Sequence, residues 1–231
     1  MNPTLDGSAQ KPDEGVVHRI LAASVTALGL LATLPAFAQA NDNEAWDGGY
    51  DQRGERRSDF VIGVSPVLVL GGASGYPNEV DKIDNPGFEA KTGFGAGAGV
   101  SVWLGGALAD WFTFGVGPTF FGTSGSQGSG SGGGVVFRVE AYPLYGVGGP
   151  LRDLAFFTTF GAGVFTVKGK AGERGEGGFT SMAGLGSAYE LFRAGHFAFA
   201  PTVQYQLVRS QSLVGHQAQI GVRAVFYGGP G

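Results

Sequence analysis

Residues 135–143 have the sequence VVFRVEAYP, in which side chains of two kinds alternate with a period of two. Val135 and Phe137 fall on one face of an extended chain, whereas Arg138 and Glu140 fall on the other. A period of two is the spacing of a β-strand, because successive side chains of a strand point to opposite faces. This stretch therefore predicts a strand with one apolar face and one face that carries charges.

The same alternation recurs in seven further segments, and in all eight segments one face carries no charged residue. The apolar series of these seven segments begin at Phe60, Phe94, Phe112, Leu154, Phe179, Phe197 and Ala218. A soluble barrel or sandwich would turn its bulky apolar side chains inward and its charges outward. Here the bulky face needs an apolar surrounding, and a closed barrel leaves no unpaired backbone edge in hydrocarbon. The pattern predicts an all-β fold, an eight-stranded antiparallel up-and-down transmembrane β-barrel over residues 59–228.

Composition excludes several classes of function. The chain has 231 residues, with 15 Lys and Arg against 19 Asp and Glu, so no excess of basic residues favours nucleic acid as a partner. It has no Cys, which excludes disulfides, thiolate metal sites and cysteine nucleophiles. Its 44 Gly are far above the usual share of about 7%. We expect inward-facing glycines, such as those at 93, 95, 97 and 99, to make room for bulky inward side chains such as Trp103.

The N-terminal part has the features of an export signal. Residues 18–40, HRILAASVTALGLLATLPAFAQA, combine a basic start, an apolar run and a small-residue exit, which is typical of a cleaved signal peptide. We expect residues 1–38 to be that signal peptide, and residues 1–15 to precede the true start because Asp13 and Glu14 do not suit a positive n-region. Residues 39–58 are expected to form a polar periplasmic segment. These features predict a protein of the Gram-negative outer membrane.

The lengths of the connections predict the orientation. Long connections are expected at 72–91, 122–134 and 168–178, a medium one at 208–216, and short ones at 106–110, 146–153 and 193–196. In outer-membrane barrels short connections are periplasmic turns and long ones are extracellular loops, so both termini are expected in the periplasm. The stretch GTSGSQGSGSGGG (122–134) is interpreted as a flexible loop tip, because it lacks the Lys and the following helix of a phosphate-binding loop.

Aromatic residues cluster beside the expected short turns. Trp and Tyr are enriched where a membrane protein meets the two membrane–water interfaces. We therefore expect a periplasmic aromatic girdle, which consists of Trp111, Phe112, Tyr145, Phe156, Phe192, Phe197, Phe226 and Tyr227.

The polar face predicts a network inside the barrel. Its expected members are Arg138, Glu140, Glu190, Gln204, Gln206, Gln219 and Arg223. Buried charges persist only when they are paired and hydrogen-bonded. We expect Arg223 to bridge to one or both acids and Arg138 to share Glu140, so that the lumen is plugged. The alternative is a narrow polar path for a small solute.

The whole pattern resembles a known family. The signal peptide, the eight alternating segments, and stretches such as FRVEAYPLYG (137–146) and FAFAPTVQYQLV (197–208) are similar to the small outer-membrane β-barrels, the group of the OmpA transmembrane domain, OmpX and OmpW. This resemblance implies a monomeric, porin-like cell-envelope barrel in contact with outer-membrane lipid and lipopolysaccharide. It also implies insertion by the outer-membrane insertion machinery, which would recognise Phe226 or Tyr227. The functions in this group range from envelope structure and adhesion to small-solute passage.

Three classes of function remain open. We expect a structural or surface-interaction barrel whose extracellular loops are available to partners, with no enzymatic activity, cofactor or metal site. The first alternative is a narrow channel or a pathway for hydrophobic small solutes of the OmpW type. The second is a lipid A-modifying enzyme, since His216 lies near Ser210 and Ser212 at the expected extracellular rim. A His–Ser–acid cluster within hydrogen-bond distance would be the signature of this enzyme.

Overall fold

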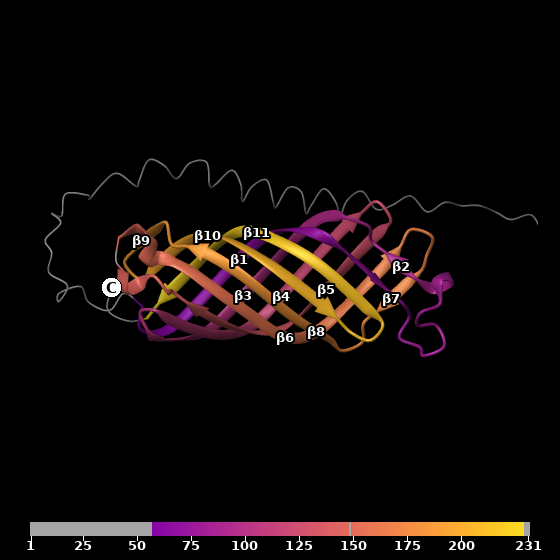
Figure 1. The fold of residues 1–231 in the computed structure, drawn as a ribbon, viewed down its shortest axis with the longest axis horizontal. Helices are drawn as coiled ribbons and strands as arrows, with labels where there is room; N and C mark the ends of the chain where they lie inside the picture. Colours follow the sequence, from indigo (N-terminus) through magenta and orange to yellow (C-terminus); the bar gives the residue numbers. More distant parts are fainter. Residues whose placement is uncertain (1–56, 148, 229–231) are drawn as a thin grey trace, which may run out of the picture. The chain divides into compact units, whose positions relative to one another are not determined.

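The computed structural model describes residues 57–147 and 149–228, and within them eight long strands form a closed barrel (Figure 1). These strands are β1 (Asp59–Gly75), β3 (Gly95–Ala109), β4 (Phe112–Gly125), β5 (Gly128–Ala141), β6 (Leu154–Gly169), β8 (Thr180–Tyr189), β10 (Phe197–Arg209) and β11 (Leu213–Tyr227). Each strand pairs antiparallel with the next, and β11 pairs with both β10 and β1, which closes the sheet. The predicted eight-stranded antiparallel up-and-down barrel is confirmed.

Short strands and 3-10 helices lie at the two ends of the barrel (Figure 1). Strands β2 (Ala90–Lys91) and β7 (Arg174–Glu176) extend β1 and β6 at one end, and β9 (Phe192–Ala194) pairs with β10 at the other. Three 3-10 helices cover Pro86–Phe88, Tyr145–Val147 and Pro150–Asp153. Within residues 57–147 and 149–228, no helix has the length and apolarity that a membrane span requires. The predicted signal peptide and most of the segment 39–58 lie outside the described residues.

The barrel has its apolar side chains on the outside, as the alternation predicts. In β1, Phe60 is 44% exposed and Leu68 is 46% exposed, whereas their neighbours Val61 and Val69 are buried. The same alternation continues around the sheet, where the large apolar side chains exposed on the other strands include Leu104, Val116, Val135, Phe160, Leu185, Val203 and Ile220. Because the strand period is two, one choice of face fixes the direction of every side chain in the barrel.

The charged residues of the eight strands divide cleanly by position. Three of them, Asp59, Lys168 and Arg209, are exposed, and each lies at or next to the end of its strand. The other three, Arg138, Glu140 and Arg223, lie within the strands and are buried in the lumen. The middle of the outer surface therefore carries only uncharged side chains in the described part of the chain.

Glycines make room inside the barrel, but at positions other than those expected. A Cβ added to Gly63 would overlap the indole of Trp103, and one added to Gly115 would lie 2.8 Å from it. A Cβ on Gly95 or Gly97 would instead meet the backbone of the neighbouring strand β4. The space for the indole therefore comes from the two strands that flank β3, because side chains at the same level of a barrel compete for the same interior volume.

The glycine-serine stretch 122–134 differs from its prediction, because it is not a loop. Strands β4 and β5 continue through it and pair as far as Ser124 with Ser129, so that only residues 126 and 127 connect them. The hydrogen bonds between paired strands are made by the backbone and need no side chains. A run of glycines has no alternation of apolar and polar residues, so the sequence gives no sign of a strand there. The connection between β10 and β11 is similarly short, at residues 210–212. The long connection expected at 122–134 is therefore absent, and the medium one expected at 208–216 is shorter than predicted.

Candidate functional site: the polar lumen

One carboxylate organises the centre of the lumen. Glu140 on β5 accepts hydrogen bonds from Arg138 on the same face of the same strand, at 3.1 Å from Nε and 2.8 Å from Nη2. Arg223 on β11 also donates to Glu140 through Nη1. All three residues are at most 6% exposed. The structure thus brings together three of the seven expected lumen residues around one carboxylate.

Two tyrosines connect this centre to Glu190, which follows β8. The Tyr142 hydroxyl lies within hydrogen-bond distance of Glu140 Oε1 and 2.7 Å from Glu190 Oε1, and it accepts a 3.1 Å hydrogen bond from Arg223 Nη2. The Tyr227 hydroxyl donates to Glu190 Oε1 over 2.7 Å. Because a hydroxyl has one proton and two lone pairs, each tyrosine can donate a hydrogen bond to a carboxylate and accept one from a guanidinium group. The network therefore extends from β5 to the end of β11.

Arg57 completes the network, and the sequence reasoning missed it. Its Nη2 donates to Glu190 and to Asp153, each over 2.7 Å, and its Nη1 donates to the Asp110 carbonyl over 3.0 Å. The guanidinium carbon lies 3.6 Å from the centre of the Tyr142 ring. Arg57 is fully buried although it precedes β1, in a segment expected to be polar and periplasmic. The one feature of the sequence that could have indicated this role is the position of a basic residue two places before the first strand.

The electrostatics of this end favour the ionised form of Glu190. Burial alone would raise the pKa of its carboxyl group. The positive charges of Arg57 and Arg223 and the hydrogen bonds from Arg57 and Tyr227 act in the opposite direction and hold that pKa below its ordinary value. Glu190 is therefore a charged and fully engaged member of the network at neutral pH.

The three expected glutamines form contacts of their own. Gln219 Nε2 donates to Gln206 Oε1 over 2.6 Å, and Gln204 Nε2 donates to Thr159 Oγ1 over 3.0 Å. Beyond them, towards the end of the barrel that carries β2 and β7, lies an apolar cluster that includes Val69, Phe121, Phe165, Met182 and Val208. The lumen thus has a charged part, an amide part and an apolar part.

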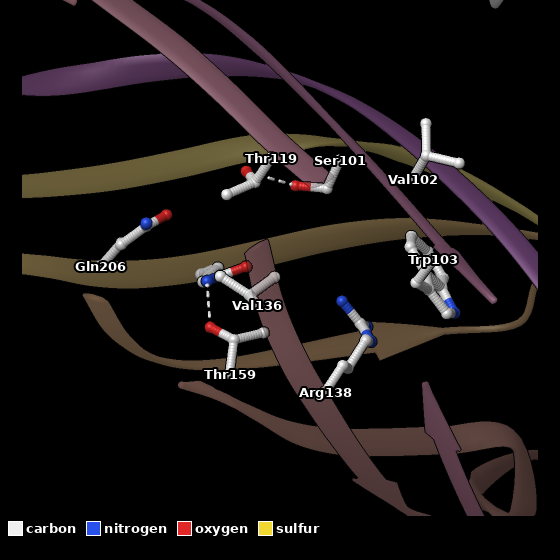
Figure 2. A pocket seen from close by; sticks show the side chains of 9 residues that line it. Ser101, Val102, Trp103, Thr119, Val136, Arg138, Thr159 and Gln206 are labelled. Carbon is white, nitrogen blue, oxygen red and sulfur yellow. Dashed lines mark hydrogen bonds between the residues drawn. The ribbon is translucent and has the colours of Figure 1, made fainter. Parts of the chain in front are cut away.

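A small cavity of about 20 Å³ lies where the charged part meets the amide part (Figure 2). Ser101, Thr119, Thr159, Arg138 and Trp103 are among the residues that line it. Ser101 and Thr119 share a 2.8 Å hydrogen bond, which Figure 2 shows beside the space. A cavity of this size holds about one water molecule.

The expected aromatic girdle is only partly exposed. Trp111, Phe156, Phe192 and Phe197 are between 42% and 55% exposed. Phe112 and Phe226 are half-buried, and they pack against Trp111 and Phe197 with ring centres 5.6 and 5.2 Å apart. Tyr145 is also half-buried and donates its hydroxyl proton to Asp110 over 2.8 Å.

Tyr227 corrects the expectation of a girdle residue. Its side chain is buried inside the barrel and bonds to Glu190, as its parity with Arg223 on β11 requires. The girdle assignment followed its nearness to the strand end and disregarded this parity. Tyr227 is therefore part of the lumen network.

The residues expected for an enzyme are engaged elsewhere. His216 Nδ1 hydrogen-bonds the hydroxyl of Tyr205 on the outer face of the neighbouring strand β10. Ser212 donates to the carbonyl of Glu176, and its hydroxyl lies 3.5 Å from that of Ser210. These contacts point His216 and Ser212 to different partners, so the cluster that would mark a lipid A-modifying enzyme is not assembled among the described residues.

An open cleft lies at the end of the barrel that carries β2 and β7. Its water-accessible volume is about 590 Å³, and the residues that line it include Glu79, Lys82, Phe88, Glu173 and Arg174. Lys82 forms a 2.7 Å salt bridge with Glu79 and lies over the Phe88 ring. In the part of the chain that the structure describes, no group of acidic and histidine side chains is arranged to hold a metal ion.

The architecture and its inverted polarity identify the fold. The chain has the fold of a small outer-membrane β-barrel. No family model and no curated protein matches the sequence. Among solved structures, the barrel is similar to Ail, the attachment invasion locus protein of Yersinia pestis, in complex with the heparin analogue sucrose octasulfate. The TM-score is 0.44 at 12% identity, over 73% of this chain and 99% of Ail.

Two further solved barrels show a comparable likeness. Neisserial surface protein A has a TM-score of 0.43 at 7% identity, over 72% of this chain and 96% of that protein. The outer membrane protein OprG from Pseudomonas aeruginosa has a TM-score of 0.37 at 13% identity, over 75% of this chain and 98% of OprG. At these identities the likeness concerns the fold alone.

Proposed function

We propose that this protein is an exported outer-membrane barrel with a structural or surface-interaction role. The observation that carries the proposal is the separation of charges, with Arg138, Glu140 and Arg223 buried in the lumen and the middle of the outer surface uncharged. A charge on the lipid-facing side of a barrel at the bilayer midplane costs about 2–4 kcal/mol, so such a surface suits acyl chains. The partners along this surface would be outer-membrane lipid and lipopolysaccharide.

The lumen of the proposed barrel is closed to ions. Support comes from the five buried charges, each of which has at least one partner of opposite sign, and from the apolar cluster beyond the glutamines. An eight-stranded barrel has an interior that side chains are just able to fill. A network that joins β5, Glu190 after β8, and β11 across the interior favours the plug over the narrow channel.

Planar-bilayer recordings test this closure. We expect the wild-type protein to show no steady conductance, and we expect Glu140→Ala to produce open events because it leaves Arg138 and Arg223 without their shared carboxylate. Glu79→Ala is the matched control, since exposed Glu79 forms a salt bridge with half-buried Lys82 at the surface cleft, away from the lumen. Steady wild-type conductance would reject the closed lumen and favour a solute pathway.

The cleft between the loop 76–89 and β7 is the proposed surface for external partners. It combines two cations, Lys82 and Arg174, with acidic neighbours and the exposed ring of Phe88. Aromatic residues and Arg are enriched in protein-binding surfaces, and Phe88 and Arg174 supply both here. This feature favours surface interaction over a purely structural role.

A further inference from the structure

The cavity beside Arg138 has an unused cationic donor. Arg138 donates hydrogen bonds from Nε and Nη2 to Glu140. Its guanidinium carbon lies 4.6 Å from the centre of the Trp103 ring and 3.5 Å from the centre of the Phe157 ring. Among the residues that the structure describes, Nη1 has no hydrogen-bond acceptor. Figure 2 shows the guanidinium between Val136 and Trp103, both of which line the cavity. Two N–H groups of a buried arginine are therefore available to an occupant of the cavity.

Two cations share one carboxylate in this part of the lumen. Arg138 and Arg223 donate to the same oxygen of Glu140, while Glu190 is engaged by Arg57 at 2.7 Å and lies 3.7 Å from Arg223. Arg57 also pairs with Asp153 over 2.7 Å. Arg138 is therefore paired with a carboxylate that it shares, and an anion at its remaining N–H groups would add to the stabilisation of this buried cation.

The other lining groups can also donate. Ser101 and Thr119 share one hydrogen bond, which leaves one of their two hydroxyl protons free to turn into the cavity. Gln204 uses one proton of its amide on Thr159 and retains the second. No carboxylate lines the cavity. The donor set is therefore that of an anion site, and about 20 Å³ admits a monatomic ion but no sulfate or phosphate.

We propose that this cavity binds one monovalent monatomic anion of the size of chloride, at Nη1 of Arg138, at one hydroxyl of the Ser101–Thr119 pair and at the hydroxyl of Thr159. The ion adds negative charge beside the two guanidinium groups that share Glu140, and it fills the space between the ion pairs and the glutamines. The inference does not depend on whether the barrel conducts, because it concerns an internal site of the folded chain.

Anomalous diffraction locates the ion directly. The full chain is folded and crystallised in bromide, with gluconate as the matched salt, because gluconate is too large for the cavity. We expect one bromide peak within hydrogen-bond distance of Arg138 Nη1, and no peak there in gluconate. Density that is the same in both salts, or an empty cavity, would show a water site or a void and overturn the proposal.

Unfolding in solution gives an independent readout. At constant ionic strength, replacing gluconate by chloride should raise the unfolding midpoint of the wild type, because a ligand that binds only the folded state stabilises it. Thr159→Val, which removes one lining hydroxyl, should reduce this shift. Thr123→Val should retain it, because Thr123 is buried in the lumen but does not line the cavity. A shift that is absent in the wild type, or equal in both variants, would contradict an ion bound at this site.

Discussion

Single residues determine whether the lumen can hold its charges. Glu140 receives both Arg138 and Arg223, so its carboxylate stabilises two buried cations at once. Sequence reasoning identified these three residues because they keep the parity of their strands. It could not identify Arg57, because a residue outside a periodic segment has no face. It misassigned Tyr227, because nearness to a strand end was given more weight than parity.

Removal of the Glu140 charge should be strongly destabilising. Glu140→Gln keeps the shape of the side chain but leaves two guanidinium groups without their carboxylate. Breaking a buried ion pair in this way costs about 3–5 kcal/mol. Urea unfolding of the barrel in detergent micelles measures the change. Glu79→Gln, at an exposed pair, should change the free energy of unfolding by less than about 1 kcal/mol, and equal effects of the two variants would contradict the assigned roles.

The pH dependence of stability should report Glu190. Its pKa is lower in the folded protein than the ordinary value of about 4.3 in an unfolded chain. A lowered carboxyl pKa contributes stability that is present above the unfolded value and is lost as the pH falls through the folded value. We therefore expect wild-type stability to decline below about pH 4, the unfolded value. Glu190→Gln should show a shallower decline, and an unchanged profile in this variant would contradict the engaged carboxylate.

At the scale of strands, parity and glycine placement set the packing of the lumen. The alternation of apolar residues was sufficient to predict all eight barrel strands and the direction of their side chains. It was insufficient at residues 122–134, where glycines and serines carry no pattern and two paired strands resemble a loop. It was also insufficient for packing partners, because the room for Trp103 comes from Gly63 and Gly115 on the flanking strands.

Gly63→Ala tests this packing between strands. The added methyl group would overlap the Trp103 indole, and overpacking of this kind costs about 1–3 kcal/mol. The double variant Gly63→Ala with Trp103→Leu should recover part of the loss, because the smaller side chain frees the space. Gly146→Ala is the control, since an added Cβ there meets no atom within 4 Å. Comparison of urea midpoints gives the result, and a Gly63→Ala protein as stable as the control would contradict the close contact.

The whole molecule is organised by one inversion, with apolar side chains outside and charges inside. Closure of the sheet by β1 and β11 satisfies the backbone without an exposed edge, which is the condition for a sheet to enter hydrocarbon. The arginine and glutamate network then stabilises the interior that this inversion creates. The proposed closure of the lumen depends on the medium that surrounds the barrel.

Spin-label accessibility tests that dependence most directly, and the chain suits it because it contains no native Cys. Single cysteines at Leu104, Val135 and Phe160, on the outer faces of β3, β5 and β6, would be labelled in lipid vesicles. We expect these labels to collide often with oxygen and rarely with a water-soluble nickel complex, as acyl-chain contact requires. Frequent collision with the nickel complex at these three sites would show that the apolar surface faces water, and it would rule out a membrane-embedded barrel.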